Sequence, residues 1–190
     1  MRKLSIVLSL TIAAILVPGR VLAATFSQLV VYGDSLSDLG RSFDATGGIA
    51  PPYGNATGGR FSNGPLWVEY LAASLGIATT PNTNFAVGGA TTGTVNTVAN
   101  ELNASGIPIL KPSQLVGIQQ QVNNSTIGDP SALYIVWGGA NDYLGGGTID
   151  PNIPVGNLTA EISTLISRGA TNILVPNLPS LGALPGTRLN

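Results

Sequence analysis

Four short runs of apolar residues recur along the chain, and each is followed by glycine or proline. Runs of four to six residues that are rich in Val, Ile, Leu, Tyr and Phe and stop at turn residues are typical of buried β-strands. We therefore expect strands at residues 29–32, 84–87, 132–137 and 172–175.

Between these runs the apolar positions change to helical spacing. Pro65 suits the first position of a helix and Gly76 the position just beyond its end, so we expect a helix between them with Trp67 in the core. We expect two further helices. In the first, at 113–122, the residues expected to face the core are Leu115, Ile118 and Val122. In the second, which ends before Gly169, they are Leu158, Ile162, Leu165 and Ile166.

The stretch from Thr46 to Gly64 contains many Gly, Pro and Asn residues, which indicates a surface loop and not a regular element. Loops at this end of a sheet often carry substrate contacts, so Tyr53, Arg60 and Phe61 are possible pocket residues. A purely structural, solvated loop is the alternative.

Strands and helices alternate along the chain, which predicts an α/β fold. Such a pattern forms a parallel sheet covered by helices on both faces, with right-handed crossovers, in three layers. In these sheets ligands bind outside the carboxyl ends of the strands. Ser35, Gly88 and Asn141 each follow one of the first three expected strands, so we expect them to converge at one edge of the sheet.

Ser35 is the candidate nucleophile, because it lies where a buried strand breaks into a turn. Ser35, Gly88 and Asn141 each lie in a segment that can also be interpreted simply as a turn. Asp-Ser and Asn-Asp pairs are common in turns because their side chains bond the nearby backbone, and Gly88 and Gly89 suit a turn with positive φ.

The three segments together resemble the GDSL or SGNH hydrolase superfamily. The residues that carry the resemblance are Gly33-Asp34-Ser35-Leu36, Asn84-Phe85-Ala86-Val87-Gly88-Gly89-Ala90-Thr91-Thr92 and Trp137-Gly138-Gly139-Ala140-Asn141-Asp142, in the order of the family. The resemblance extends from about Phe26 to about Pro185 and implies a flavodoxin-like strand order.

By this resemblance Ser35 is the nucleophile of a hydrolase that acts on carboxylic esters. The backbone N–H of Gly88 and the side-chain amide of Asn141, with the N–H of Ser35, would stabilise the oxyanion, and one such donor is worth roughly 3 to 4 kcal/mol. Asp34 and Asp142 match the family motifs as orienting and loop-shaping groups. The expected substrate is a small-molecule or lipid ester.

The chain contains no histidine, although a serine nucleophile needs an adjacent general base. Relatives supply it from a late Asp-x-x-His motif, which has no counterpart before Asn190. We therefore expect the carboxyl-terminal part of the fold to be missing. A carboxylate in place of the histidine would be a weak base for the serine proton, because its pKa is near 4. A non-catalytic exported ligand-binding or adhesion domain, and an acyltransferase that uses the same site, are the alternatives.

Residues 1–23 have the pattern of a secretory signal peptide. Arg2 and Lys3 precede an apolar stretch from Leu4 to Val17, and Val21-Leu22-Ala23 resembles a cleavage site. The apolar stretch is shorter than the roughly 20 residues that span a bilayer. We expect a secreted or periplasmic protein with no integral membrane segment after signal removal, and one hydrolase domain, incomplete, at residues 24–190.

The composition narrows the choice of partners and cofactors. Without the signal the chain has five basic and nine acidic side chains, which disfavours nucleic-acid binding. The absence of Cys excludes disulfides, and the absence of both His and Cys excludes the common zinc sites, so we expect no cofactor and no catalytic metal. The sequence gives no indication of the oligomeric state.

Overall fold

The computed structural model describes residues 26–78, 80, 82–184 and 187. The expected signal peptide at 1–23 lies outside the described residues. Within them the element order is β1 (Leu29–Gly33), α1 (Arg41–Ala45), α2 (Gly54–Thr57), α3 (Trp67–Leu75), α4 (Thr97–Ala104), η1 (Pro112–Gln114), α5 (Ile118–Asn124), β2 (Leu133–Trp137), α6 (Ala140–Leu144), α7 (Asn152–Ser167), β3 (Asn172–Leu174) and η2 (Leu181–Ala183).

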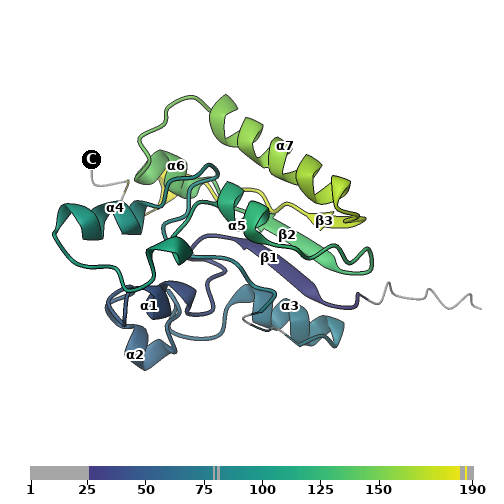
Figure 1. Ribbon diagram of the computed structural model, residues 1–190, viewed down its shortest axis with the longest axis horizontal. Helices are drawn as coiled ribbons and strands as arrows, with labels where there is room; N and C mark the ends of the chain where they lie inside the picture. Colours follow the sequence, from purple (N-terminus) through teal and green to yellow (C-terminus); the bar gives the residue numbers. More distant parts are fainter. Residues whose placement is uncertain (1–25, 79, 81, 185–186, 188–190) are drawn as a thin grey trace, which may run out of the picture.

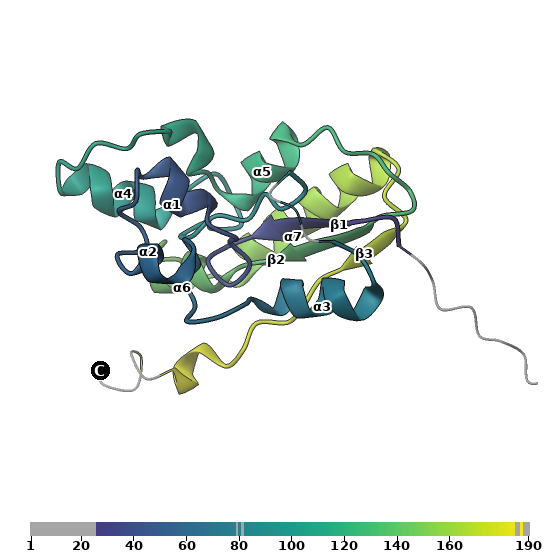
Figure 2. The same cartoon turned by 90° about the horizontal axis from the view of Figure 1, so that it is seen from below.

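The centre of the molecule is a parallel sheet in the order β1-β2-β3. Leu29 lies opposite Leu133, and Leu133 lies opposite Asn172. Helix α3 covers one face of this sheet, and α5 and α7 cover the other (Figure 2). The fold is therefore α/β in three layers, which confirms the prediction from the alternating sequence pattern.

The alternation of side chains along β1 divides the core into two clusters. Val30 and Tyr32 face α5 and α7, whereas Leu29 and Val31 face α3, and all four are buried. Tyr32 stacks on Phe85 with ring centroids 5.3 Å apart, and its hydroxyl donates a hydrogen bond to Ser125 Oγ. Burial raises the pKa of Tyr32 to about 12.

The expected strand at 84–87 is replaced by a single bridge between Asn84 and Val31. The backbone still follows the free edge of β1, because Phe85 N–H donates to Val31 O and Val87 N–H donates to Gly33 O. The ladder is interrupted at Gly33, whose N–H donates to Gln121 Oε1 and not to this segment, while the side chain of Asn84 accepts from Ala86 N–H. The resulting spatial order, from this segment through β1 and β2 to β3, is consistent with a flavodoxin-like sheet.

Helix α3 ends where the sequence predicts, with Gly76 in the left-handed region, but it begins two residues after Pro65, at Trp67, because Leu66 has extended backbone and is the N-cap. The helix expected at 113–122 starts later, at Ile118. The N–H groups of Gly117 and Ile118 donate to carbonyls of the loop at 91–94, which holds these residues outside a longer helix. Leu115, Ile118 and Val122 are buried as expected.

The longest helix, α7, differs from its predicted face. Leu165 is buried, but Ile166 is 58% exposed, and Glu161 is buried in its place. The loop expected at 46–64 also contains the one-turn helix α2. Helices α1, α2, α4 and α6 gather beyond the carboxyl ends of the strands (Figure 1). No helix within the described part of the chain combines the length and the apolar character needed to cross a membrane.

Candidate active site

Ser35 lies two residues beyond β1, in a turn held by Asp34. Asp34 O accepts from Ser37 N–H at 3.0 Å, and Asp34 Oδ1 accepts from Leu36 N–H at 3.0 Å. Ser35 is half-buried, and its hydroxyl makes no hydrogen bond to any residue that the structure describes. The turn thus fixes the backbone of the candidate nucleophile but provides no base for its hydroxyl.

The buried carboxyl of Asp34 is the titratable group next to Ser35 in the chain. Burial raises its pKa to about 6, opposed by the Leu36 hydrogen bond and assisted by the nearby negative charge of Asp142. A carboxylate with this pKa is a stronger base than an ordinary aspartate. It nevertheless makes no hydrogen bond to the Ser35 hydroxyl within the described structure.

Gly88 differs from its expected role. Its N–H donates to Asp38 Oδ2 at 2.9 Å and lies 2.7 Å from Ser42 Oγ, so the group expected to bind an oxyanion already has partners inside the protein. The physical reason is the fully buried carboxylate of Asp38, which also accepts the N–H groups of Gly40, Arg41 and Ser42. A buried carboxylate needs such donors, and Gly88 supplies one of them.

Gly89, the next residue, has the backbone geometry that Gly88 lacks. Its φ is +77°, and a Cβ there would lie 2.6 Å from Val98 N. Its carbonyl accepts from Thr97 N–H at 2.8 Å, whereas its N–H makes no hydrogen bond within the described residues. In the sequence only the Gly88-Gly89 pair points to this residue, and the pair alone does not show which of the two N–H groups is free.

Asn141 lies in the first turn of α6, after a left-handed Gly139. Its Nδ2 donates to Ala90 O at 2.9 Å, which uses one of the two amide hydrogens and leaves the other for a ligand. This bond joins the asparagine motif to the loop that contains Gly88 and Gly89. In the same segment, Val87 N–H donates to Gly33 O at 3.1 Å, so hydrogen bonds connect the segment at 84–92 to each of the other two motifs.

Asp142 is buried and holds the next part of the same loop. Its carboxylate accepts from Thr92 N–H at 2.9 Å and from Thr92 Oγ1 at 2.6 Å. Asn157 on α7 donates to Thr92 Oγ1 at 3.0 Å. The loop at 88–94 is thus fixed from α6 and from α7, and its glycines have a defined position relative to the end of β1.

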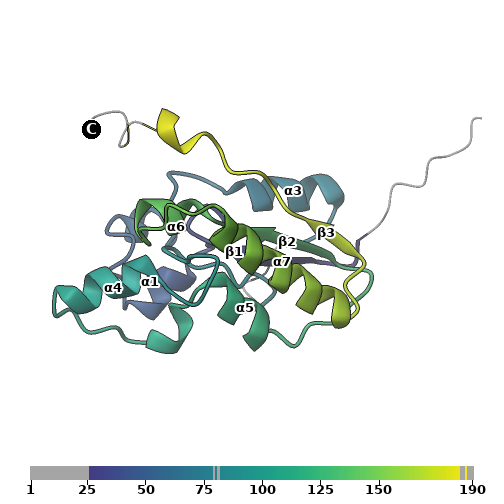
Figure 3. The same ribbon diagram turned by 90° about the horizontal axis from the view of Figure 1, so that it is seen from above.

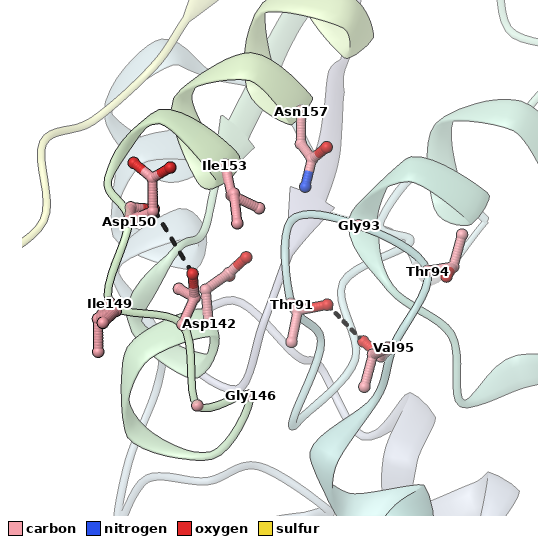
Figure 4. A pocket seen from close by; sticks show the side chains of 12 residues that line it. Thr91, Gly93, Thr94, Val95, Asp142, Gly146, Ile149, Asp150, Ile153 and Asn157 are labelled. Atoms are coloured by element: carbon pink, nitrogen blue, oxygen red, sulfur yellow. Dashed lines mark hydrogen bonds between the residues drawn. The ribbon is translucent and has the colours of Figure 1, made fainter.

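A cavity of about 590 Å³ adjoins this network (Figure 4). Asp142 and Asn157 line it, together with Val95, Ile149 and Ile153, which contribute an apolar surface. Ser35, Gly88 and Asn141 are not among the lining residues. The cavity is therefore a neighbour of the candidate catalytic groups, since it is lined by Thr91 and Gly93 of the loop at 88–94 and by Asp142, which follows Asn141.

The three possible pocket residues of the loop at 46–64 have separate surroundings. Arg60 forms a two-point ion pair with Glu69, with nitrogen–oxygen distances of 2.9 and 2.7 Å. The Phe61 ring packs against Gly88, where it would meet any Cβ, and Tyr53 is 52% exposed. None of the three lines the 590 Å³ cavity.

The sequence that contains these three motifs matches the model of one known protein family. The family model described as GDSL-like Lipase/Acylhydrolase matches residues 29–190. The chain belongs to the GDSL-like lipase/acylhydrolase family. This match covers the strand, loop and helix segments that carry Ser35, Gly88 and Asn141.

Several curated proteins are similar to this chain over most of its length. The phosphatidylcholine-sterol acyltransferase of Aeromonas hydrophila is 33% identical over 86% of the chain and 48% of that protein. The secreted effector protein SseJ of Salmonella typhimurium is 31% identical over 88% of the chain and 38% of that protein. An acetylesterase of Thermothelomyces thermophilus is 31% identical over 91% of the chain and 60% of that protein. The chain thus spans about half or less of the first two of these relatives.

Proposed function

We propose that this GDSL-family chain carries the nucleophile and oxyanion half of an ester-hydrolysing site. The observation that carries the proposal is a pair of hydrogen bonds from the segment at 84–92, which brings the three motifs together: Val87 N–H donates to Gly33 O, and Ala90 O accepts from Asn141 Nδ2. In the proposed reaction Ser35 Oγ attacks the ester carbonyl, the alcohol leaves, and water then releases the acid from the acyl-serine.

The oxyanion donors follow from which N–H groups are free. Asn141 keeps one amide hydrogen, and Gly89 has a backbone N–H without a partner among the described residues. We assign the oxyanion to Asn141, to the N–H of Ser35 and to Gly89, with Gly88 in a supporting position. Two or three such donors stabilise the negative charge that develops on the carbonyl oxygen.

The proposed reaction also needs a general base that accepts the proton of the Ser35 hydroxyl. The 190 residues contain no histidine, and the relatives are longer than the aligned region. We propose that an Asp-x-x-His segment encoded downstream supplies it, and that the chain is exported. The signal-like pattern at residues 1–23 and the similarity to a relative named as a secreted effector support export.

The decisive test is restoration of activity in a longer protein. We expect the reading frame beyond Asn190 to encode an Asp-x-x-His, and the extended protein to cleave a p-nitrophenyl ester. Ser35→Ala should lower kcat/KM by about 10⁴-fold or more, because the covalent step is lost. Ser163→Ala, an exposed serine on α7, is the matched control and should keep full activity.

Two results decide against hydrolysis by this site. An extended protein whose ester cleavage survives Ser35→Ala does not use the proposed nucleophile. A stop codon directly after Asn190 favours the alternative of a non-catalytic exported binding domain. The acyltransferase alternative, favoured by the name of the Aeromonas relative, is distinguished by mass spectrometry of products formed with a sterol or other alcohol acceptor present.

A further inference from the structure

The cavity of about 590 Å³ beside the asparagine motif has no role in the chemistry assigned to Ser35, Gly89 and Asn141. Its volume lies within the range of roughly 300 to 1,000 Å³ that is typical of small-molecule sites. One wall is the loop at 91–95, and the other is formed by Asp142 and the connection from α6 into α7. Helices α4 and α6, which adjoin these walls in the chain, both lie beyond the carboxyl ends of the strands (Figures 1 and 3). The cavity is therefore at the same end of the sheet as the candidate active site.

Hydrogen bonds fix both walls of this cavity. On the loop at 91–95, Val95 O accepts from Thr91 N–H at 3.0 Å and from Thr91 Oγ1 at 2.8 Å. On the other wall, Gly146 N–H donates to Asn141 O at 2.7 Å, which joins that wall to the turn that carries the candidate oxyanion donor. Walls that are already ordered lower the entropic cost of binding a ligand.

Exposed apolar side chains line the cavity on both walls. Val95 is 45% exposed, Ile153 is 52% exposed and Ile149 is 95% exposed. In Figure 4 the side chains of Ile153 and Asn157 face the loop that carries Thr91 and Val95. A ligand that covers apolar side chains removes their area from water, and apolar side chains gathered at a cavity mark a binding site. The lining therefore favours an apolar ligand.

The charged groups at the cavity are acidic. Asp142 and Asp150 line it, and neither lysine nor arginine is among its described lining residues. The two carboxylates accept hydrogen bonds from Thr92 and Asn152, respectively. An anionic group in the cavity would lose water and lie near two negative charges without a compensating cation. The lining is thus suited to an uncharged chain and selects against an anion.

The position of the cavity distinguishes the two substituents of the ester carbonyl. Thr91 and Asp142 of the lining follow closely on Gly89 and Asn141, the proposed oxyanion donors, whereas the turn that contains Ser35 contributes no lining residue. The base that accepts the Ser35 proton must later donate it to the leaving alcohol, so the alcohol lies on the side of that base. The substituent that remains for the donor side is the acyl chain.

We propose that the 590 Å³ cavity binds the hydrocarbon chain of an uncharged medium-length acyl group, with Val95 and Ile153 as the residues that determine specificity. The assignment to the acyl side rests on the proposed esterase function. Neither Ser35, Gly89 nor Asn141 lines the cavity, so the first carbons of the chain must bridge from the carbonyl to the lining. An acetyl group is too short to do so. The preferred substrates are therefore esters of medium-chain fatty acids.

The first test measures binding by the full chain and requires no catalysis. The uncharged fluorescent probe N-phenyl-1-naphthylamine should bind, and methyl octanoate should displace it. Monomethyl octanedioate has a chain of the same length that ends in a carboxylate, and it should displace the probe roughly tenfold less well or worse, because the cavity disfavours an anion. Ser35→Ala should leave both results unchanged.

Variants of the two walls show where the chain binds. Val95→Ser and Ile153→Ser should each weaken the binding of methyl octanoate about fivefold, the loss expected when a half-exposed apolar side chain no longer contributes. Val155→Ser is the matched control, because Val155 is 60% exposed on the same helix as Ile153 but does not line the cavity. This variant should bind methyl octanoate as the wild type does.

The second test is kinetic and uses the extended protein. Ile153→Ser should lower the ratio of kcat/KM for p-nitrophenyl octanoate to that for p-nitrophenyl acetate about fivefold, mainly through KM, whereas Val155→Ser should keep this ratio. Octyl acetate has the long chain on the alcohol side. Its kcat/KM relative to that of ethyl acetate should not respond to Ile153→Ser.

Four results overturn the proposal. Val95→Ser and Ile153→Ser could bind methyl octanoate as tightly as the wild type, or monomethyl octanedioate could displace the probe equally well. The extended protein could fail to bind the probe, which would show that its downstream segment covers the cavity. Ile153→Ser could lower the octyl acetate ratio, which would assign the cavity to the alcohol. A chain that binds methyl octanoate through Ile153 but cleaves no ester when extended contradicts the proposed esterase and leaves the binding site in place.

Discussion

At the scale of single residues, adjacent positions with similar chemistry have different surroundings. Gly88 and Gly89 are neighbours, but the N–H of Gly88 stabilises buried Asp38 whereas that of Gly89 has no described partner. Asp34 and Asp38 are both buried acids, yet Asp38 accepts four N–H groups and Asp34 accepts Leu36 N–H at its side chain. The different hydrogen bonding of these residues follows from which backbone N–H groups each carboxylate can reach.

This difference predicts that alanine is tolerated differently at the two glycines. Gly89→Ala should destabilise the protein by about 2 kcal/mol or more, because its left-handed φ is costly for alanine and its Cβ would meet the backbone of Val98. Gly88→Ala should cost less, because its φ lies outside the left-handed region and only the end of the Phe61 side chain, which can move aside about χ1, opposes the new Cβ. Urea denaturation of both variants measures the difference, and a larger loss for Gly88→Ala would contradict this account.

At the scale of elements, α3 is fixed by its amino-terminal turn as well as by packing. Glu69 Oε2 accepts from Leu66 N–H at 2.7 Å, a backbone donor that the helix itself leaves free, and the same carboxylate pairs with Arg60. The pair connects α3 to the loop at 46–64. The hydrogen bond from Arg60 holds the pKa of Glu69 below its usual value.

Glu69→Gln should therefore lower the free energy of unfolding by about 1 kcal/mol at pH 7, discounted for the partial exposure of both partners. Because the folded pKa of Glu69 is depressed, its contribution is present above the unfolded pKa near 4.5 and is lost as the pH falls through the folded value. In urea denaturation the difference between the wild type and the variant should shrink as the pH falls below 4.5 toward the depressed folded pKa. Glu101→Gln, at an exposed glutamate on α4, is the matched control. A difference between wild type and Glu69→Gln that stays constant from pH 7 to about pH 3 would contradict the role of this ion pair.

At the scale of the whole molecule, stability depends on the sheet between its helix layers. The chain has no cysteine, so no disulfide contributes, and β1 and β2 supply most of the largest fully buried side chains. The loops beyond the strands expose apolar side chains instead, with Ile149 at 95%. The contribution of each isoleucine to the free energy of unfolding therefore depends on how deeply its side chain is buried.

Ile135→Ala, in the centre of β2, should destabilise the protein by about 2 to 5 kcal/mol through lost burial and the cavity that remains. Ile149→Ala is the matched control and should change stability by less than about 0.5 kcal/mol. Chemical denaturation measures both. Equal effects of the two substitutions would show that β2 is not the centre of the core.

The sequence by itself determined the α/β fold, the positions of β1, β2 and α3, and the family, because apolar periodicity and short motifs are local properties of the chain. Tertiary structure decided the features that depend on distant partners. It assigned the Gly88 N–H to Asp38 and turned Ile166 outward. It also buried Glu161 against α5, because α7 packs on the sheet through one side and the register of that contact comes from its neighbours. Which donor is free and which carboxylate is buried depends on atoms far apart in the sequence, and only the folded chain brings them together.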